Sequence, residues 1–160
     1  GVTPDIVAGK CVMYVFIGTV VGDMFSGVLS QWLQSRKKAI GIMTTMTLAG
    51  VAFYLYGGIT KADTFYLVAA ILGFSIGYIA MFLTATAESF GTNLRGTATS
   101  TVANFVRATT LLTLPLFQYF KPTLGVLGSG GLVAFLCFAI AYLSLFLMEE
   151  TFHKELDYVE

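Results

Sequence analysis

GDMFSGVLSQWLQSRKK, from Gly22 to Lys38, gives the strongest indication of how this chain folds. It carries a single acid, Asp23, in an apolar run that contains no other charge between Lys10 and Arg36. Such a run can cross the hydrocarbon core of a membrane, which requires roughly 20 predominantly apolar residues. Three consecutive cations then close the run, and cation clusters favour the cytoplasmic side. The stretch therefore predicts a membrane helix that leaves the bilayer into the cytoplasm.

The composition of the whole chain also indicates a membrane protein. Hydrophobic residues make up 56% of the 160 residues and charged residues 11%, whereas soluble domains carry roughly 25% charged residues. The mean hydropathy is +0.80. The formal net charge is zero and the cations are scattered, unlike the clustered basic surface of a nucleic-acid-binding protein. We therefore expect an all-α integral membrane protein that contacts the lipid bilayer and binds no nucleic acid.

Five apolar segments separated by polar turns predict five transmembrane helices. An odd number of crossings and a first residue other than Met led us to expect a piece of a longer protein. Cations in the short loops predict that the turns near Arg36 and Arg95 are cytoplasmic, and that Lys61 and Lys121 are external. The predicted helices cover residues 4–33, 39–58, 64–89, 96–120 and 132–148, which form a bundle over 1–148, followed by a cytoplasmic tail over 149–160.

Two pairs of glycines follow helical spacing, Gly18 with Gly22 and Gly73 with Gly77. Small residues four positions apart let two membrane helices approach closely. We interpret both pairs as helix-packing positions, with direct substrate contact by Gly73 and Gly77 as the alternative.

Asp23 and Arg107 are isolated charges in apolar segments, and Asn104 shares the helical face of Arg107. An ionisable residue within a membrane is costly and suggests a functional site. Asp23 precedes Arg36 by thirteen residues and Arg107 follows Arg95 by twelve, which places both roughly 18–20 Å from the same loops. We predict an ion pair between Asp23 and Arg107. It either fixes two helices permanently or exchanges with a proton, a coupling ion or a substrate.

No metal, cofactor or catalytic centre is predicted. Cys11 and Cys137 have no CxxC spacing, and His153 is the only histidine. An intramembrane enzyme would require a nucleophile with a base, or a metal cluster, and these residues supply neither.

Three separated signatures resemble the major facilitator superfamily, in its sugar and other organic-solute transporter branch. SGVLSQWLQSRKK is similar to the G-x-L-x-D-x-x-G-R-[RK] loop of that family, AESFGTNLRGTATS to its E-x-F-P-T-x-x-R-G-T segment, and EETFHKELDYVE to its acidic E-T-x-x-x-x-L-D tail. Their order matches the carboxyl-terminal half of such a transporter. Gln31, Ser35 and Gly91 depart from the family pattern, which places the gating charges in question.

The resemblance implies a secondary transporter that moves a small organic solute by alternating access, by proton or ion symport or, as the alternative, as a uniporter. The five helices would be the last five of a twelve-helix major facilitator fold, partnered by an amino-terminal half outside this chain. A bacterial inner membrane and a cytoplasmic C-terminus are expected. The residues that match the cytoplasmic gate or motif are Gly27, Arg36, Lys37, Lys38, Glu88 and Arg95.

Three alternatives stay open on the sequence. A membrane scaffold or assembly subunit of the same fold would carry the same signatures without transporting. Glu88 would pair with Arg95 or the Arg36 cluster in a gate, or would be an interfacial acid in water. The tail acids would dock on the cationic loops, although a charged terminus is usually solvated.

Overall fold

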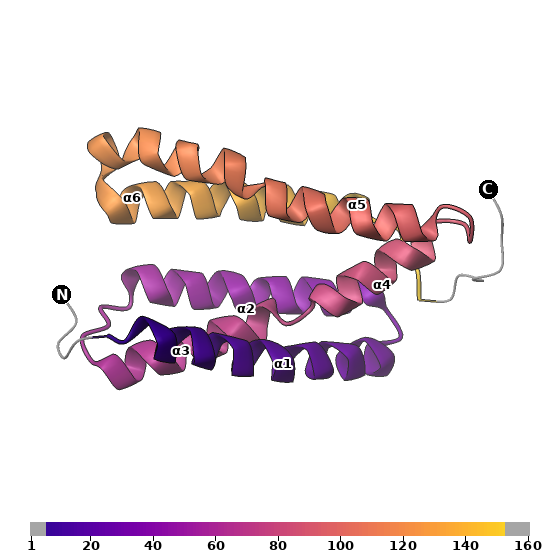
Figure 1. Cartoon of the computed structure of the whole chain (residues 1–160), viewed down its shortest axis with the longest axis horizontal. Coiled ribbons are helices and arrows are strands. Elements are labelled where there is room, and N and C mark those ends of the chain that lie inside the picture. Colours follow the sequence, from indigo (N-terminus) through magenta and orange to yellow (C-terminus); the bar gives the residue numbers. More distant parts are fainter. Residues whose placement is uncertain (1–5, 153–160) are drawn as a thin grey trace. The chain divides into compact units, whose positions relative to one another are not determined.

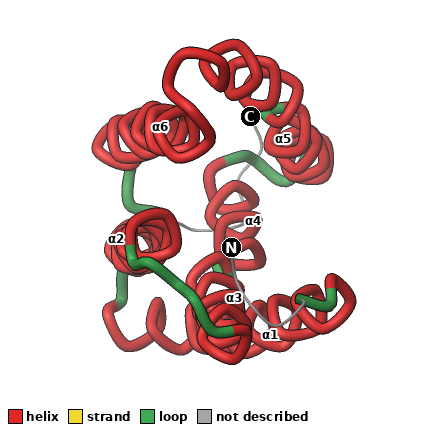
Figure 2. The backbone as a smooth tube through the Cα atoms, turned by 90° about the vertical axis from the view of Figure 1, so that its left-hand side faces the viewer, coloured by secondary structure: helices red, strands yellow, loops and turns green. Residues whose placement is uncertain are grey.

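The structure is a computed structural model that describes residues 6–152. All regular secondary structure in this range is helical, and Figure 2 shows only helices and loops there. This confirms the all-α class. The chain divides into two compact units, Gly1–Met81 and Phe82–Glu160, and each is described by itself. The helices are α1 (Ala8–Leu33), α2 (Arg36–Tyr56), α3 (Ala62–Ile76), α4 (Ile79–Ser89), α5 (Arg95–Ala108) and α6 (Thr110–Leu147).

Four helical stretches in the described range are long and apolar enough to cross a membrane. Many large apolar side chains on them are exposed, including Trp32 at 81% and Phe146 at 77%. Large apolar side chains exposed in such numbers mark contact with lipid or with other protein. The chain is therefore a multi-pass integral membrane protein. The four stretches are Ala8–Leu33, Arg36–Tyr56, Ala62–Ser89 and Arg95–Leu147.

The first unit is organised around the contact of α1 with α3, which cross each other in Figure 1. A Cβ atom on Gly18 would overlap the carbonyl oxygen of Ala70, and one on Gly22 would overlap that of Phe74. From the other side, a Cβ atom on Gly73 would overlap the carbonyl oxygen of Val15. Without side chains at these positions the two backbones come into direct contact. We call this contact the glycine seam.

Aromatic pairs and one hydroxyl bond extend the glycine seam. Tyr14 of α1 stacks on Tyr66 of α3 with ring centroids 5.5 Å apart. At the other end Phe25 lies 5.2 Å from Phe74. Thr47 of α2 donates its hydroxyl to the carbonyl oxygen of Ser75 at 3.0 Å. Three helices of the first unit are thereby held together.

The structure differs from the single helix expected over 64–89, because α3 ends at Ile76 and α4 begins at Ile79. Gly77 leaves the helical conformation with a ψ angle of 56°. It does so where it meets α1, since a Cβ atom on Gly77 would lie 2.6 Å from the amide nitrogen of Asp23. A long apolar run looks continuous in sequence, whereas the close backbone contact occurs only in three dimensions.

In the second unit, α5 leads into α6, and α6 folds back on itself in Figure 1. The fold-back occurs at Gly125, whose φ angle of 69° and ψ angle of −179° lie outside the helical region. Glycine adopts this conformation at no steric cost. The sequence predicted a loop over 121–131. The structure instead keeps helical residues on both sides of one non-helical glycine.

The predicted ends of the other helices differ by a few residues. The first begins at Ala8, and its predicted start at Pro4 lies outside the described residues. The second was expected over 39–58, yet α2 starts at Arg36 because the Ser35 hydroxyl accepts a hydrogen bond from the Lys38 amide at 3.1 Å. Because of this N-cap, Arg36, Lys37 and Lys38 lie in the first turn of α2 and not in a loop.

Candidate functional site

Asp23 lies on α1 beside the break between α3 and α4. Its carboxylate oxygen Oδ1 accepts a hydrogen bond from the backbone amide of Ala80 at 3.4 Å. Ser26 donates its hydroxyl to the Asp23 carbonyl oxygen at 2.9 Å, which satisfies that hydroxyl within α1. The side chain of Asp23 is half-buried. The predicted intramembrane acid therefore contacts the start of a second, interrupted helix.

A hollow of about 520 Å³ lies along the same face of α1. Asp23 and Arg36 are its two charged lining residues, and Gln31 is an uncharged polar one. This arrangement offers an anionic group, an amide and a cation to a polar ligand. The complete lining consists of Asp23, Met24, Gly27, Val28, Gln31 and Arg36.

The cationic turn between α1 and α2 is built from local contacts. Arg36 donates from Nη1 to the Ser30 hydroxyl oxygen at 2.9 Å. Ser30 is fully buried. Gln34 adopts a left-handed conformation with φ of 48°, and its amide bonds back to the carbonyl oxygen of Gln31 at 3.3 Å. The turn therefore directs Arg36 back toward α1 and the hollow.

Glu88, at the end of α4, is bonded to the start of the tail. The Thr151 hydroxyl donates to Glu88 Oε2 at 2.9 Å, and Thr151 is only 2% exposed. Glu150 Oε1 accepts bonds from the amides of Thr151 and Phe152 at 3.0 and 3.1 Å. Arg95 donates from Nε to the carbonyl oxygen of Ala87 at 2.9 Å.

Thr151 is a site residue that the sequence reasoning did not select. A solvated tail was expected, but Thr151 is buried against Glu88. The available signal was the hydroxyl residue that directly follows two acids at the end of an apolar segment. The tail acids beyond Phe152 lie outside the described residues.

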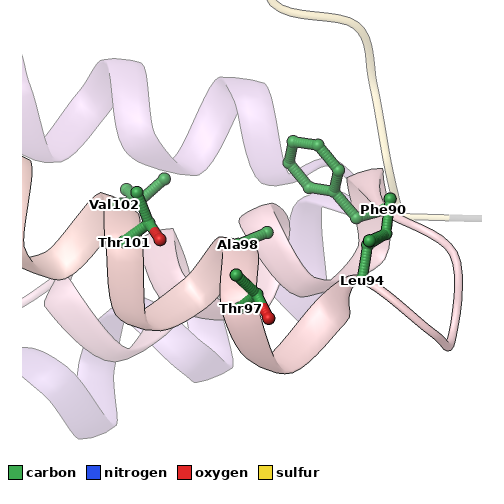
Figure 3. Close-up of a pocket in the computed structure, with 6 residues that line it drawn as sticks. All are labelled: Phe90, Leu94, Thr97, Ala98, Thr101 and Val102. Atoms are coloured by element: carbon green, nitrogen blue, oxygen red, sulfur yellow. The ribbon is translucent and has the colours of Figure 1, made fainter.

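The polar face of α5 carries Asn104 and Arg107, and both side chains are exposed. None of the described residues of α5 is buried. A neighbouring face of the same helix borders an apolar hollow of about 280 Å³, which Asn104 and Arg107 do not line (Figure 3). Phe90 and Leu94 complete that lining with Thr97, Ala98, Thr101 and Val102.

Several predicted site residues lie in different units. Asp23, Gly27 and Arg36 belong to the first unit, and Glu88 and Arg107 to the second. The ion pair between Asp23 and Arg107 therefore stays a prediction, as does a gate between Glu88 and the Arg36 cluster. The unit that contains Glu88 also contains Arg95.

No group of three potential metal ligands occurs among the residues that the structure describes. Cys11 and Cys137 are free thiols.

Comparison with known proteins gives one informative similarity. The chain resembles the facilitated trehalose transporter Tret1 of Bombyx mori, with 27% identity over 154 aligned residues. The alignment covers 91% of this chain and 30% of the relative, so the chain spans less than a third of that protein's length. No family model matches the chain. No solved structure matches it either. The similarity to a transporter confirms the resemblance that the three sequence signatures indicated.

Proposed function

We propose that this chain is the carboxyl-terminal part of a secondary transporter that moves a small organic solute across a membrane by alternating access. The similarity to a transporter along nearly the whole chain carries the proposal. Its apolar helices supply the membrane-embedded scaffold that such a protein requires.

The distribution of polar groups supports a transport pathway. Secondary transporters use interrupted helices near the middle of the membrane, where helix ends face a cavity. The break between α3 and α4 is such an interruption, and the pathway acid Asp23 lies beside it. The polar face of α5 supplies Asn104 and Arg107 as further solute-contacting candidates.

We propose five membrane crossings, because the last helical stretch is too long for one. Arg95–Leu147 comprises 53 residues, whereas one crossing takes roughly 20. The break at Gly125 divides it into two crossings of suitable length. Arg36, Arg95 and the C-terminus would then share the cytoplasmic side, as the cation bias requires. The relative is an insect protein, so the bacterial inner membrane expected from the sequence stays a prediction.

The solute class follows from the relative. Its name states trehalose transport, and we propose that this chain serves a transporter of small polyhydroxy solutes of the sugar class. Carboxylate, carboxamide and guanidinium groups at Asp23, Gln31 and Arg36 would bind hydroxyl groups well, because charge-assisted hydrogen bonds are the stronger ones.

Two modes of transport each have an observation that supports them. The relative is named a facilitated transporter, which favours movement down the solute gradient. Ion or proton symport is supported by Asp23 as an acid inside an apolar helix. If Asp23 binds the coupling ion, Asp23→Asn should abolish accumulation against a gradient and leave solute exchange intact. If transport is facilitated, the unmodified protein accumulates nothing.

Uptake of radiolabelled trehalose and of a monosaccharide into proteoliposomes tests the proposal. The full reading frame that contains this chain should transport at least one of the two sugars. The purified chain of residues 1–160 should not, because we propose that an amino-terminal half completes the pathway. Uptake by residues 1–160 alone would overturn the need for that partner. A full-frame protein that reaches the membrane folded but moves neither sugar would contradict the sugar class and favour the scaffold alternative.

A further inference from the structure

The break between α3 and α4 creates a new helix start at Ile79. The first N–H groups of an α-helix have no carbonyl partner within that helix. Ser, Thr, Asp or Asn before the first turn normally accepts from one of them. The residue before α4 is Tyr78, whose phenol group is too far from its own backbone for this role. The acceptor must therefore come from elsewhere in the chain.

Asp23 provides that acceptor from α1. Its Oδ1 atom lies 3.4 Å from the amide nitrogen of Ala80, the second residue of α4. A side-chain cap normally bonds to the second or third amide of a helix, so the position in α4 is the expected one. A carboxylate also interacts favourably with the positive end of the helix dipole.

The glycine seam keeps Asp23 of α1 next to the start of α4. A Cβ atom on Gly77 would lie 2.6 Å from both the amide nitrogen of Asp23 and the Cα atom of Gly22. The backbone just before α4 is thus in direct contact with the backbone that carries Asp23. Removal of the Asp23 carboxylate would take away this acceptor from the first turn of α4.

We propose that Asp23 is a positioning residue that caps the N-terminus of α4 from α1 and thereby holds the first turn of α4 against the glycine seam. The inference rests on the proposed function only in placing this break inside a membrane transporter. Oδ1 accepts the capping bond, and the carboxylate has further lone pairs that a solute or an ion can use. A partner that draws the Asp23 carboxylate away from the Ala80 amide would release the start of α4.

Hydrogen–deuterium exchange at the amide of Ala80, measured on the intact protein in nanodiscs, tests the cap. Asp23→Ala should accelerate exchange roughly five- to tenfold, as expected for loss of an N-cap. Asp23→Asn should stay within about twofold of the unmodified protein, because its amide oxygen still accepts a hydrogen bond. Thr19→Val is the matched control, since the Thr19 hydroxyl bonds only to Val15 of its own helix among the described contacts, and it should change nothing at Ala80.

A second variant separates capping from a general loss of packing. Adding Tyr78→Asn to Asp23→Ala places a cap residue directly before α4 and should restore the protection of Ala80. A packing defect on α1 would not be repaired from Tyr78. Unchanged exchange in Asp23→Ala, or exchange in Asp23→Asn as fast as in Asp23→Ala, would overturn the cap.

The exchange result and the transport result are independent. A protein that moves no solute but shows the expected exchange pattern contradicts the proposed function and supports the cap. A protein that transports sugar normally, with the amide of Ala80 equally protected in every variant, supports the proposed function and overturns the cap.

Discussion

At the level of single residues, three polar contacts lie where helices begin, end or break. Asp23 bonds to the first turn of α4, Arg36 bonds to Ser30 at the turn between α1 and α2, and Glu88 bonds to Thr151 after α6. Helix ends expose amide and carbonyl groups that need partners, most of all in an apolar medium. Asp23, Arg36 and Glu88 are proposed for function and also form hydrogen bonds at these helix ends. Variants must therefore separate the functional role from the structural one.

Asp23 and Arg107 can be tested as a pair by a double-mutant cycle. If they form an ion pair, Asp23→Asn and Arg107→Gln should each cost about 3 kcal/mol of stability, because each leaves one charge without its partner in the bundle. The double variant should then cost clearly less than the sum of the two. Thermal unfolding of the full-frame protein in detergent measures all four states. Strictly additive losses would show that the two side chains do not interact.

Thr151→Val tests the contact between the tail and α4. The substitution keeps the shape of the side chain but removes the hydroxyl that donates to Glu88 Oε2. Loss of a buried hydrogen bond to a charged group should cost about 1–3 kcal/mol. Protease cleavage near residues 149–152 should become faster, since this bond helps to hold the tail start.

Thr123→Val is the control for that experiment, because the Thr123 hydroxyl bonds to the Phe120 carbonyl oxygen of its own helix at 3.0 Å. It should leave cleavage of the tail unchanged. Equal cleavage of the Thr151→Val protein and the unmodified protein would mean that the tail is held by other contacts.

At the scale of helices, the first unit depends on backbone contact more than on large side chains. Gly18, Gly22, Gly73 and Gly77 bring α1 and α3 together, and aromatic pairs lie at both ends of the seam. Lipid tails are as apolar as leucine, so membrane helices gain little from burying apolar groups against each other. Close van der Waals packing stabilises them instead.

Substitutions of two glycines on α1 should have opposite effects on stability. A Cβ atom on Gly22 would overlap the backbone of Phe74, whereas one on Gly27 would meet no atom within 4 Å. Gly22→Ala should therefore cost roughly 1–3 kcal/mol through overpacking. Gly27→Ala should be neutral or stabilising by up to about 1 kcal/mol, because alanine favours the helix.

Thermal unfolding in the same detergent compares the two variants. The difference in stability between the two variants is the informative result, because both changes add one methyl group to the same helix. A Gly22→Ala protein as stable as the Gly27→Ala protein would rule out the glycine seam as a close contact.

At the scale of the whole molecule, the proposed topology follows from the cations of the short connections. Arg36, Lys37 and Lys38 lie at the start of α2, and Lys61 directly precedes α3. Because α2 alone separates these two positions, they should face opposite sides of the membrane. The same reasoning places Arg95 with Arg36 if α3 and α4 together make one crossing.

Single-cysteine labelling decides this topology. In a protein with Cys11 and Cys137 replaced by serine, Lys61→Cys should react with an impermeant maleimide in intact cells. Lys37→Cys should react only after permeabilisation, because we place it in the cytoplasm. Reaction of both positions from outside would contradict the assignment of α2 as a crossing.

The sequence identifies individual residues of the candidate site, but it does not show which of them contact one another. Asp23 was selected because a charge in an apolar run is rare and costly. Its bond to Ala80 could not be foreseen, since the two residues are 57 positions apart and the break that exposes the Ala80 amide arises at the glycine seam. Thr151 was overlooked for a related reason, because its partner Glu88 is 63 residues away.

The amino-acid sequence alone is enough to show an all-α, multi-pass membrane protein that resembles a solute transporter. Those properties depend on hydropathy, segment length and local motifs, which are read along the chain without knowing any contact. The positions at which the apolar runs are interrupted become visible only in three dimensions. Gly77 leaves the helix where α1 meets it, and Gly125 alone, within an apparent loop, turns α6 back. At Gly77 the break coincides with direct contact to the backbone of α1, whereas a Cβ atom on Gly125 would meet no atom within 4 Å, so that turn uses the conformational freedom of glycine itself.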